Sequence, residues 1–255
     1  MSTVPDSVPL EGARFVGRNL RGARFVESDL SGVVMRGVDV QGADIDAPWL
    51  PGGVLLVNGV DVASYVEAEL DRRHPGRDRR RAEDPEGLRA AWASLRTAWT
   101  ALVERALAMP EGTVDRSVDG EWTFSQTLRH LVLATDSWLG KAVLGREQPF
   151  HPLGQPRTGA EEDGLDLSLF TSTTPPFAEV LAAREDRVAT MRAFLDAVTR
   201  EQLAEARANP WDPQYPETVL TCVQVVLEEE WEHLRYAERD LDALAAGPAD
   251  PAPQD

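Results

Sequence analysis

Residues 13–27 read ARFVG-RNLRG-ARFVE, and five-residue blocks of this kind run from residue 8 to residue 52. The first position of a block is mostly small or β-branched, the third is large and apolar, and the fifth is mostly Gly. The third positions are Leu10, Phe15, Leu20, Phe25, Leu30, Met35, Val40, Ile45 and Leu50. A period of five fits neither an α-helix nor a flat strand. A fixed short period predicts a solenoid, in which each unit buries its apolar face against the next unit.

Phe and Leu alternate at the block centres, with Ala or Ser two residues earlier, and this pattern resembles pentapeptide-repeat proteins. The resemblance implies a short right-handed quadrilateral β-helix, to which we assign residues 1–57, with residues 54–57 as one more extended rung. The small-residue rule fails at Arg18, Val33 and Val38. Residues 8–52 hold five Arg against six Asp and Glu, so the coil is nearly neutral. A short neutral coil argues against a DNA mimic and favours a scaffold, an interaction surface or a homodimer contact.

The composition of the whole chain limits its function and location. The net charge of −17 argues against nucleic-acid and anionic-membrane partners, which both reward clustered cations. The single Cys222 excludes an internal disulfide and fits a reducing compartment. The N-terminus has no signal pattern, and no apolar run reaches the length of about 18 residues that a bilayer requires. One Lys beside 25 Arg indicates a GC-rich genome, and we expect a cytoplasmic bacterial protein.

Residues 58–84 are predicted to hold a short helix and a basic linker. Asn58-Gly59 is a turn signal, and Asp61 is placed to cap the helix. The run Arg72–Arg81 is rich in Arg and also contains His74. We interpret this run as an exposed linker, with a specific anion site as the alternative.

Four longer helices with apolar residues at helical spacing follow, and they predict a bundle over residues 85–246. They cover about Pro85–Ala108, Thr123–Leu144, Phe177–Ala206 and Thr218–Ala246. Thr123 and Gln126 form a capping-box pattern at the start of the second helix. A loop of about 30 residues, near 145–175, joins the second and third helices, and loops of that length are usually functional or mobile. The tail 247–255 is expected to be disordered.

The fourth helix carries two candidate metal ligands. Glu229 and His233 are four residues apart, so they lie on one helix face, as ligands from a single helix often do. Helical spacing also allows the neighbouring stripe through Glu230 and His233, so the choice between the two glutamates stays open. His130, inside the second helix, is the third candidate, and two imidazoles with one carboxylate suit zinc, iron or nickel. The alternative is two core histidines, each hydrogen-bonded to a carboxylate.

The segments EWTFSQTLRH, residues 121–130, and VLEEEWEHLRYAERDL, residues 226–241, resemble the DinB-like bundle family. The resemblance covers about residues 85–245 and implies an up-and-down four-helix bundle with a long crossover. It also implies a divalent metal held by one His of the second helix and an H-x-x-x-H pair of the fourth. His130 and His233 match this pattern, whereas Glu229 stands in place of the first His of the pair. Several relatives are transferases or isomerases that use mycothiol, bacillithiol or glutathione, and others have no known activity.

Further residues are candidates for the walls of the site. Trp122 and Tyr236 are predicted to line the pocket, with aromatic core packing as the alternative. His151, on the long loop, is a candidate for the pocket mouth, with simple surface exposure as the alternative. Cys222 is expected to be a buried inert thiol, because no cationic neighbour is visible to lower its pKa.

Two functions are consistent with these features. The first is a metal-dependent thiol S-transferase or hydrolase that acts on a small electrophile, with a low-molecular-weight thiol as cosubstrate. The second is a non-catalytic protein that binds a partner or a second copy through the coil and keeps only a relic metal site.

Overall fold

The structure is a computed structural model that describes residues 10–26, 28–48 and 50–247. The chain divides into two compact units, Met1–Asp46 and Ala47–Asp255. This division precedes the boundary at residue 57 that the repeat pattern suggested. The predicted tail lies outside the described residues, apart from Gly247.

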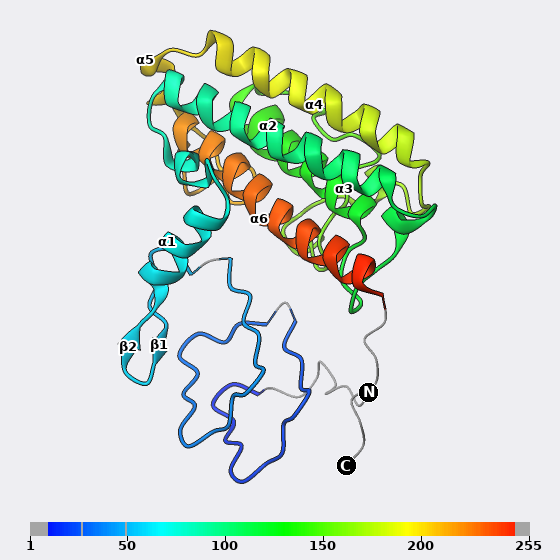
Figure 1. Ribbon diagram of the computed structural model, residues 1–255. Coiled ribbons are helices and arrows are strands. Elements are labelled where there is room, and N and C mark those ends of the chain that lie inside the picture. The colour runs from blue at the N-terminus through cyan, green and yellow to red at the C-terminus, as the bar shows by residue number, and fades with distance from the viewer. Residues whose placement is uncertain (1–9, 27, 49, 248–255) are drawn as a thin grey trace. The chain divides into compact units, whose positions relative to one another are not determined.

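In the first unit, turns recur every ten residues, which is every second block. Figure 1 draws the described residues of this unit as a winding trace in blue. At each turn a backbone N–H donates to the carbonyl three residues earlier, at 2.9–3.1 Å, and this occurs at Ala13, Ala23, Val33 and Ala43. The preceding residue is Gly with a φ of 68° to 73° each time, as a type II turn requires. No strand occurs among the described residues of 10–46, and their block-centre side chains are 44–60% exposed. The β-helix therefore stays a prediction.

The second unit opens with a hairpin of β1 (Leu56–Val57) and β2 (Val60–Asp61). Its turn residues Asn58 and Gly59 both have positive φ, 51° and 82°, and such a two-residue turn pairs its flanking strands with each other. The prediction that residues 54–57 form one more rung of the coil is therefore wrong. The carboxylate of Asp61 accepts a hydrogen bond from the N–H of Ala63, at the start of α1 (Ala63–Arg73).

The long helices begin close to where the sequence predicts, and three of the four begin at a capping side chain. Asp84 accepts two backbone N–H bonds at the start of α2 (Pro85–Ala108), and Thr218 accepts one at the start of α6 (Val219–Ala246). The capping box of Thr123 and Gln126 is confirmed at the start of α3 (Phe124–Thr135). The second predicted helix is not uniform, because α3 continues into η3 (Asp136–Val143), a π-helical segment. Such segments are rare and are frequent at functional sites.

The third predicted helix ends earlier than expected. It is α4 (Phe177–Ala197), and a second capping box, between Thr199 and Gln202, begins the separate short helix α5 (Arg200–Leu203). The chain then forms β3 (Ala206–Arg207), which pairs with β4 (Glu217–Thr218). A continuous helix to residue 206 was therefore wrong, because the local capping signal of Thr199 starts a new helix.

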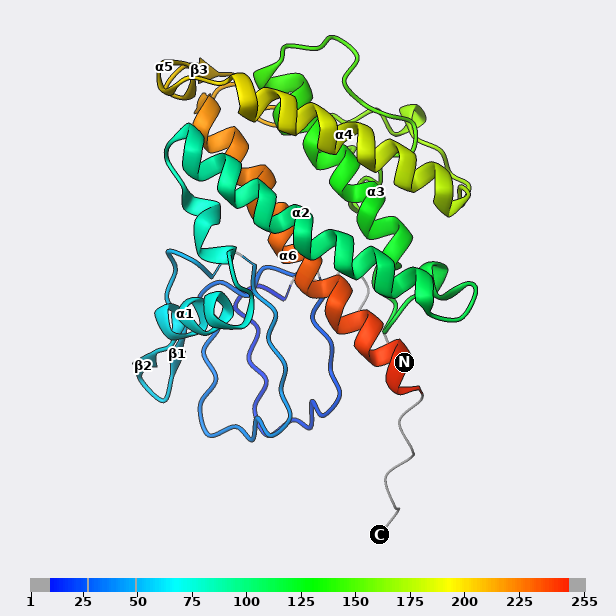
Figure 2. The ribbon, with the colours of Figure 1, turned by 45° about the horizontal axis from the view of Figure 1, so that its top comes forward.

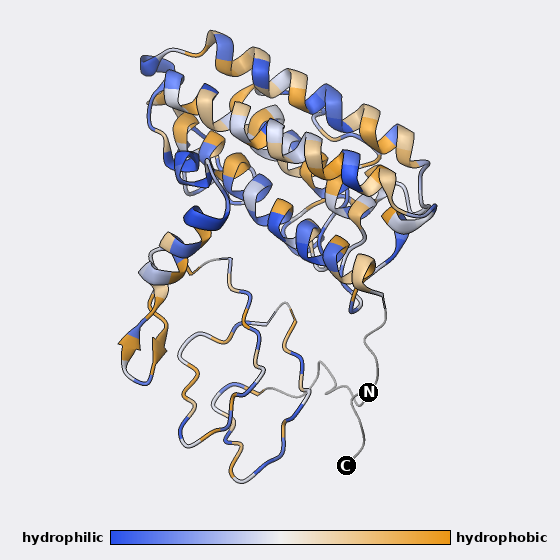
Figure 3. Ribbon diagram, viewed as in Figure 1, coloured by the Kyte–Doolittle hydropathy of each residue, from blue (hydrophilic) through white to orange (hydrophobic). Residues whose placement is uncertain are grey.

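Helices α2, α3, α4 and α6 lie side by side and enclose one apolar core (Figures 1 and 2). Each of them carries both hydrophilic and hydrophobic residues along its length (Figure 3). The largest fully buried side chains include Trp99, Leu131, Met191, Leu227 and Leu241. None of the described helices combines the length and the apolarity that a membrane-spanning segment needs.

The crossover between η3 and α4 is packed against the helices. It includes the 3₁₀ turn η4 (Leu167–Leu169), and a second 3₁₀ turn, η2 (Thr113–Asp115), lies before α3. A small apolar cluster forms under the crossover from Leu133, Ala160, Leu165, Phe150, Phe170 and Trp211. This cluster gives the long loop a small apolar core of its own, which includes Leu133 of α3.

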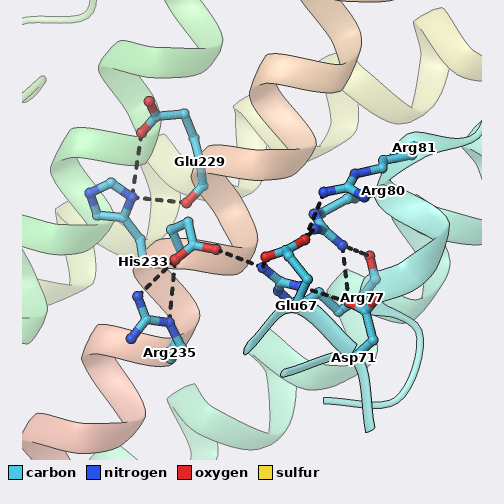
Figure 4. Close-up of polar contacts among 9 residues, drawn as sticks. Glu67, Asp71, Arg77, Arg80, Arg81, Glu229, His233 and Arg235 are labelled. Carbon is cyan, nitrogen blue, oxygen red and sulfur yellow. Dashed lines mark hydrogen bonds and ion pairs between the residues drawn. The ribbon is translucent and has the colours of Figure 1, made fainter. Parts of the chain in front are cut away.

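The basic run folds into η1 (Arg77–Arg81) and packs against α6. Arg77 and Arg80 are each only 2% exposed, so the interpretation as an exposed linker is wrong for both. Both arginines form ion pairs with the carboxylates of Glu67 and Asp71 in α1 (Figure 4). Arg77 also reaches Glu232 of α6, at 3.2 Å.

Candidate metal centre

Helix α6 carries two of the three predicted ligands on one face. The imidazole of His233 lies next to Glu229, one helical turn earlier (Figure 4). Its Nδ1 lies 2.8 Å from the backbone oxygen of Glu229 and 3.4 Å from the carboxylate Oε2. A carbonyl oxygen can only accept, so Nδ1 carries the proton and Nε2 is left with its lone pair.

Helix α3 supplies the third residue, His130. Its Nδ1 lies 3.1 Å from the backbone oxygen of Gln155, in the crossover. Nδ1 must again be the donor, so the lone pair of Nε2 points away from the crossover. A histidine that binds a metal usually donates its other nitrogen in this way, which fixes the ring and its tautomer.

The three side chains meet at one place. The Nε2 of His130 lies 3.3 Å from Oε2 of Glu229. One ligand atom from each of His130, Glu229 and His233 lies within 4.8 Å of the other two, and no further His, Cys, Asp or Glu joins this group among the residues with described positions. The side chains are 15%, 22% and 13% exposed, respectively, so the group is neither sealed nor fully open.

Burial and mutual contact shift the pKa values of these residues. Burial lowers the pKa of His233 to about 4, and the nearby His130 contributes to the same shift. Burial by itself would raise the pKa of Glu229, but the contact with His130, and the positive charge that His130 and His233 carry when protonated, lower it below its usual range. Near neutral pH the site therefore offers a neutral imidazole and an ionised carboxylate, the forms in which these groups bind metals.

Aromatic rings cover the two histidines. The ring centroid of Trp122 lies 4.7 Å from that of His130 and 6.1 Å from that of His233. Tyr236 meets His233 edge to face at 5.7 Å. Both aromatic pocket candidates therefore contact the site. They limit the room around the ligand atoms and shield them from solvent.

His151 has other partners. Its ring Nδ1 accepts a hydrogen bond from the backbone N–H of Leu153. The backbone N–H of His151 donates to the carboxylate of Asp136 in η3. Asp136 in turn forms an ion pair with Arg187 of α4. His151 thus belongs to the contacts that fasten the crossover, and it is not part of the ligand group.

The two adjacent glutamates have different surroundings. Glu230 is fully buried and pairs with Arg184 of α4 inside the core. Burial raises its pKa and outweighs the effect of the arginine. The structure thus directs Glu229, and not Glu230, towards His130. Cys222 is buried as expected, and burial raises the pKa of its thiol to about 11.

Two participants were not anticipated from the sequence, Arg129 and the backbone carbonyl of Gln155. Arg129 is buried beside His130 and donates to the crossover. The available signal was its position within the buried run of α3, where a charged residue is unusual. Nothing in the sequence marks Gln155, because its contribution is a backbone oxygen.

The helical unit therefore presents a His-Glu-His group of the kind that holds a divalent metal. A family model for the DinB superfamily matches residues 94–237, and a model for pentapeptide repeats matches eight copies over residues 10–46. The chain belongs to the DinB superfamily and carries pentapeptide repeats in its N-terminal part, as the resemblances indicated. Comparisons with curated proteins and with solved structures gave no match.

Proposed function

We propose that this protein binds a divalent metal through His130, Glu229 and His233 and uses it in an enzymatic reaction. The observation that carries the proposal is the 3.3 Å contact between Nε2 of His130 and Oε2 of Glu229. The proton on Nδ1 of His130 is already committed to the oxygen of Gln155. A neutral His130 and an ionised Glu229 would therefore turn two lone pairs towards each other, which is favourable only with a cation or a second proton between them.

The donor set supports a metal in this role. Two donors bonded to zinc at about 2.0–2.1 Å, with a tetrahedral angle between them, are about 3.3 Å apart. Imidazole nitrogen suits zinc, nickel and iron, and carboxylate is a competent additional ligand. Three protein ligands leave at least one position open, as in catalytic rather than structural sites.

The reaction that fits this donor set is hydrolysis of a small electrophile or transfer of a low-molecular-weight thiol to it. A bound divalent metal supplies Lewis acidity, which lowers the pKa of a water or a thiol at the open position. The protein keeps the histidines in their ligand tautomers through the backbone oxygens of Gln155 and Glu229. Trp122 and Tyr236 restrict access to the site and exclude water from part of it.

Metal analysis of the purified protein tests this proposal. We expect about one equivalent of zinc, nickel or iron per chain, and a higher melting temperature when zinc or nickel is added to metal-free protein. His130→Ala should abolish both effects. His151→Ala is the matched control, because His151 lies outside the ligand group, and it should retain both. Purified protein without metal, whose melting temperature does not respond to zinc or nickel, would falsify the proposal.

The exposed apolar side chains of the repeats favour a second function for the N-terminal unit. Phe15, Phe25 and Met35 are each more than half exposed. Several exposed apolar side chains within one short unit are typical of an interaction surface. A protein without residues 1–46 should then keep its fold but lose self-association or partner binding, as measured by light scattering. An unchanged oligomeric state and unchanged partners would exclude this role.

We also propose the detailed architecture of the two units. The ten-residue period of the turns supports a quadrilateral β-helix over residues 10–46. The common core of α2, α3, α4 and α6, with a long connection before α4, supports a four-helix bundle with one crossover.

A further inference from the structure

Arg129 precedes His130 in α3 and is almost completely buried, with 6% of its surface exposed. Among the described residues it forms no ion pair. Its Nε donates to the oxygen of Leu153 at 2.8 Å, and its Nη2 lies 3.4 Å from the oxygen of Thr171. A buried charge without a carboxylate partner is costly, and this charge is balanced only by carbonyl dipoles of the crossover. Packing alone would be served equally well by an apolar side chain.

The contacts of Arg129 and His130 form one continuous set. The N–H of Gln155 donates to the backbone oxygen of Arg129 at 3.1 Å. The oxygen of the same Gln155 accepts the proton from Nδ1 of His130, also at 3.1 Å. The side chain of Arg129 therefore binds the carbonyl of Leu153, two residues before Gln155, whose carbonyl orients His130.

The crossover itself is rigid enough to transmit this constraint. A Cβ added at Gly154 would lie 2.9 Å from a ring carbon of Phe170 and 3.2 Å from the oxygen of His151, so the segment is tightly packed. The backbone N–H of Thr171 donates to the backbone oxygen of Pro152 at 2.8 Å. This bond joins the two segments of the crossover that Arg129 contacts, around residues 153 and 171. A displacement of residue 153 would thus move the carbonyl of residue 155 as well.

We propose that Arg129 is a positioning residue for the metal centre. It holds Leu153 and Thr171 so that the oxygen of Gln155 stays against Nδ1 of His130, and Nε2 consequently faces Glu229. The planar guanidinium has donors fixed in a fork, so one side chain can hold two carbonyls at once, which lysine cannot do with the same geometry. The expected effect of Arg129 on metal affinity rests on the proposed function. Its expected effect on the hydrogen bond from Nδ1 of His130 to Gln155 does not.

The test follows the Nδ1–H protons of the metal-free protein by ¹⁵N-edited NMR, which is practical because the chain has only four histidines. In the wild type, the Nδ1–H of His130 should exchange slowly with water. In Arg129→Met this proton should exchange at least tenfold faster, because Leu153 and Thr171 lose their side-chain donor and only the backbone bond to residue 129 still holds Gln155. The Nδ1–H of His233, whose acceptor is in its own helix, should not change and serves as an internal reference.

Zinc affinity is the second measurement. Arg129→Met should weaken zinc binding about 10- to 100-fold, as is typical when a partner that orients a ligand is lost. Arg89→Met is the matched control, because Arg89 also donates to a backbone carbonyl, that of Leu195 in α4, which lies outside the crossover. This control should leave both the exchange rate and the zinc affinity unchanged.

Slow exchange of the His130 proton in folded Arg129→Met would overturn the proposal. If that variant does not fold, Arg129→Lys decides the question, since a single ammonium cannot replace the fork. An exchange rate and a zinc affinity equal to those of the wild type in Arg129→Lys would then overturn it. If the wild type binds no zinc, the proposed function fails, while the exchange rates still decide the role of Arg129.

Discussion

Glu229 and Glu230 are consecutive residues of α6, yet their carboxylates lie in different environments. Oε2 of Glu229 is 3.3 Å from the imidazole of His130, whereas Glu230 is fully buried against Arg184. Successive residues of a helix point about 100° apart, so one helix can direct adjacent glutamates to the candidate metal centre and to the core. Two substitutions of one type should therefore have two different consequences.

Glu230→Gln should destabilise the fold by about 3–5 kcal/mol, because it leaves the charge of Arg184 buried without a counter-ion. Where the variant remains folded, its metal content should equal that of the wild type. Urea denaturation and metal analysis measure the two effects. Glu229→Gln is the matched substitution, and it should lose metal with a smaller change in stability. Loss of metal in folded Glu230→Gln would contradict this division of roles.

Glu229→His should restore the H-x-x-x-H pair that is typical of the family. Because imidazole is a good ligand for zinc and nickel, this variant should bind both at least as tightly as the wild type. Glu229→Gln should bind them at least tenfold more weakly, since the amide oxygen carries no charge. Calorimetric titration of the three metal-free proteins distinguishes these outcomes. Equal affinity in all three would show that position 229 is not a ligand.

The free energy of unfolding of the metal-free protein should depend on pH through His233. Its pKa falls from 6.5 to about 4 on folding. Between these values the unfolded chain binds more protons than the folded protein, so stability falls as the pH falls through this window. The contribution is at most about 1.4 kcal/mol per pH unit, and it is constant above pH 6.5. Urea denaturation at pH 7 and pH 5 should give a smaller loss for His233→Gln than for the wild type, and equal losses would contradict the assignment.

Arg77→Met should destabilise the helical unit by about 3 kcal/mol or more, because Arg77 is buried between Glu67, Asp71 and Glu232. Limited proteolysis should then cut near α1 faster than in the wild type. Arg79→Met, in the same short helix but exposed, is the control and should change stability by no more than about 0.5 kcal/mol. Equal stability of the two variants would show that the buried ion pairs do not fasten α1.

Some features of the site were predictable because they are local. The spacing of Glu229 and His233 fixes their common helix face, and the capping box at Thr123 fixes the start of the helix that carries His130. The partner of Nδ1 of His130 was not predictable. It is a backbone oxygen 25 residues away, and every residue type has the same backbone oxygen.

The burial of Arg77 is a second feature that could not be predicted from the sequence. A run rich in arginine is usually solvated, and its charge predicts an exposed segment. Whether a cation is buried depends on which carboxylates meet it, and here Glu232 is 155 residues away in the chain. Long-range pairing of this kind leaves no periodic pattern in the sequence.

The sequence by itself determined the five-residue repeat, the starts of the long helices and the three residues of the metal centre as candidates, because each depends on residues a few positions apart. The tertiary structure decided that Glu229 rather than Glu230 faces His130 and that Arg77 and Arg80 are buried. It also decided that Arg129 donates hydrogen bonds to backbone carbonyls of the crossover. The physical reason is that burial, counter-ions and hydrogen-bond partners are properties of packed elements. They exist only after α3, α6 and the crossover have come together.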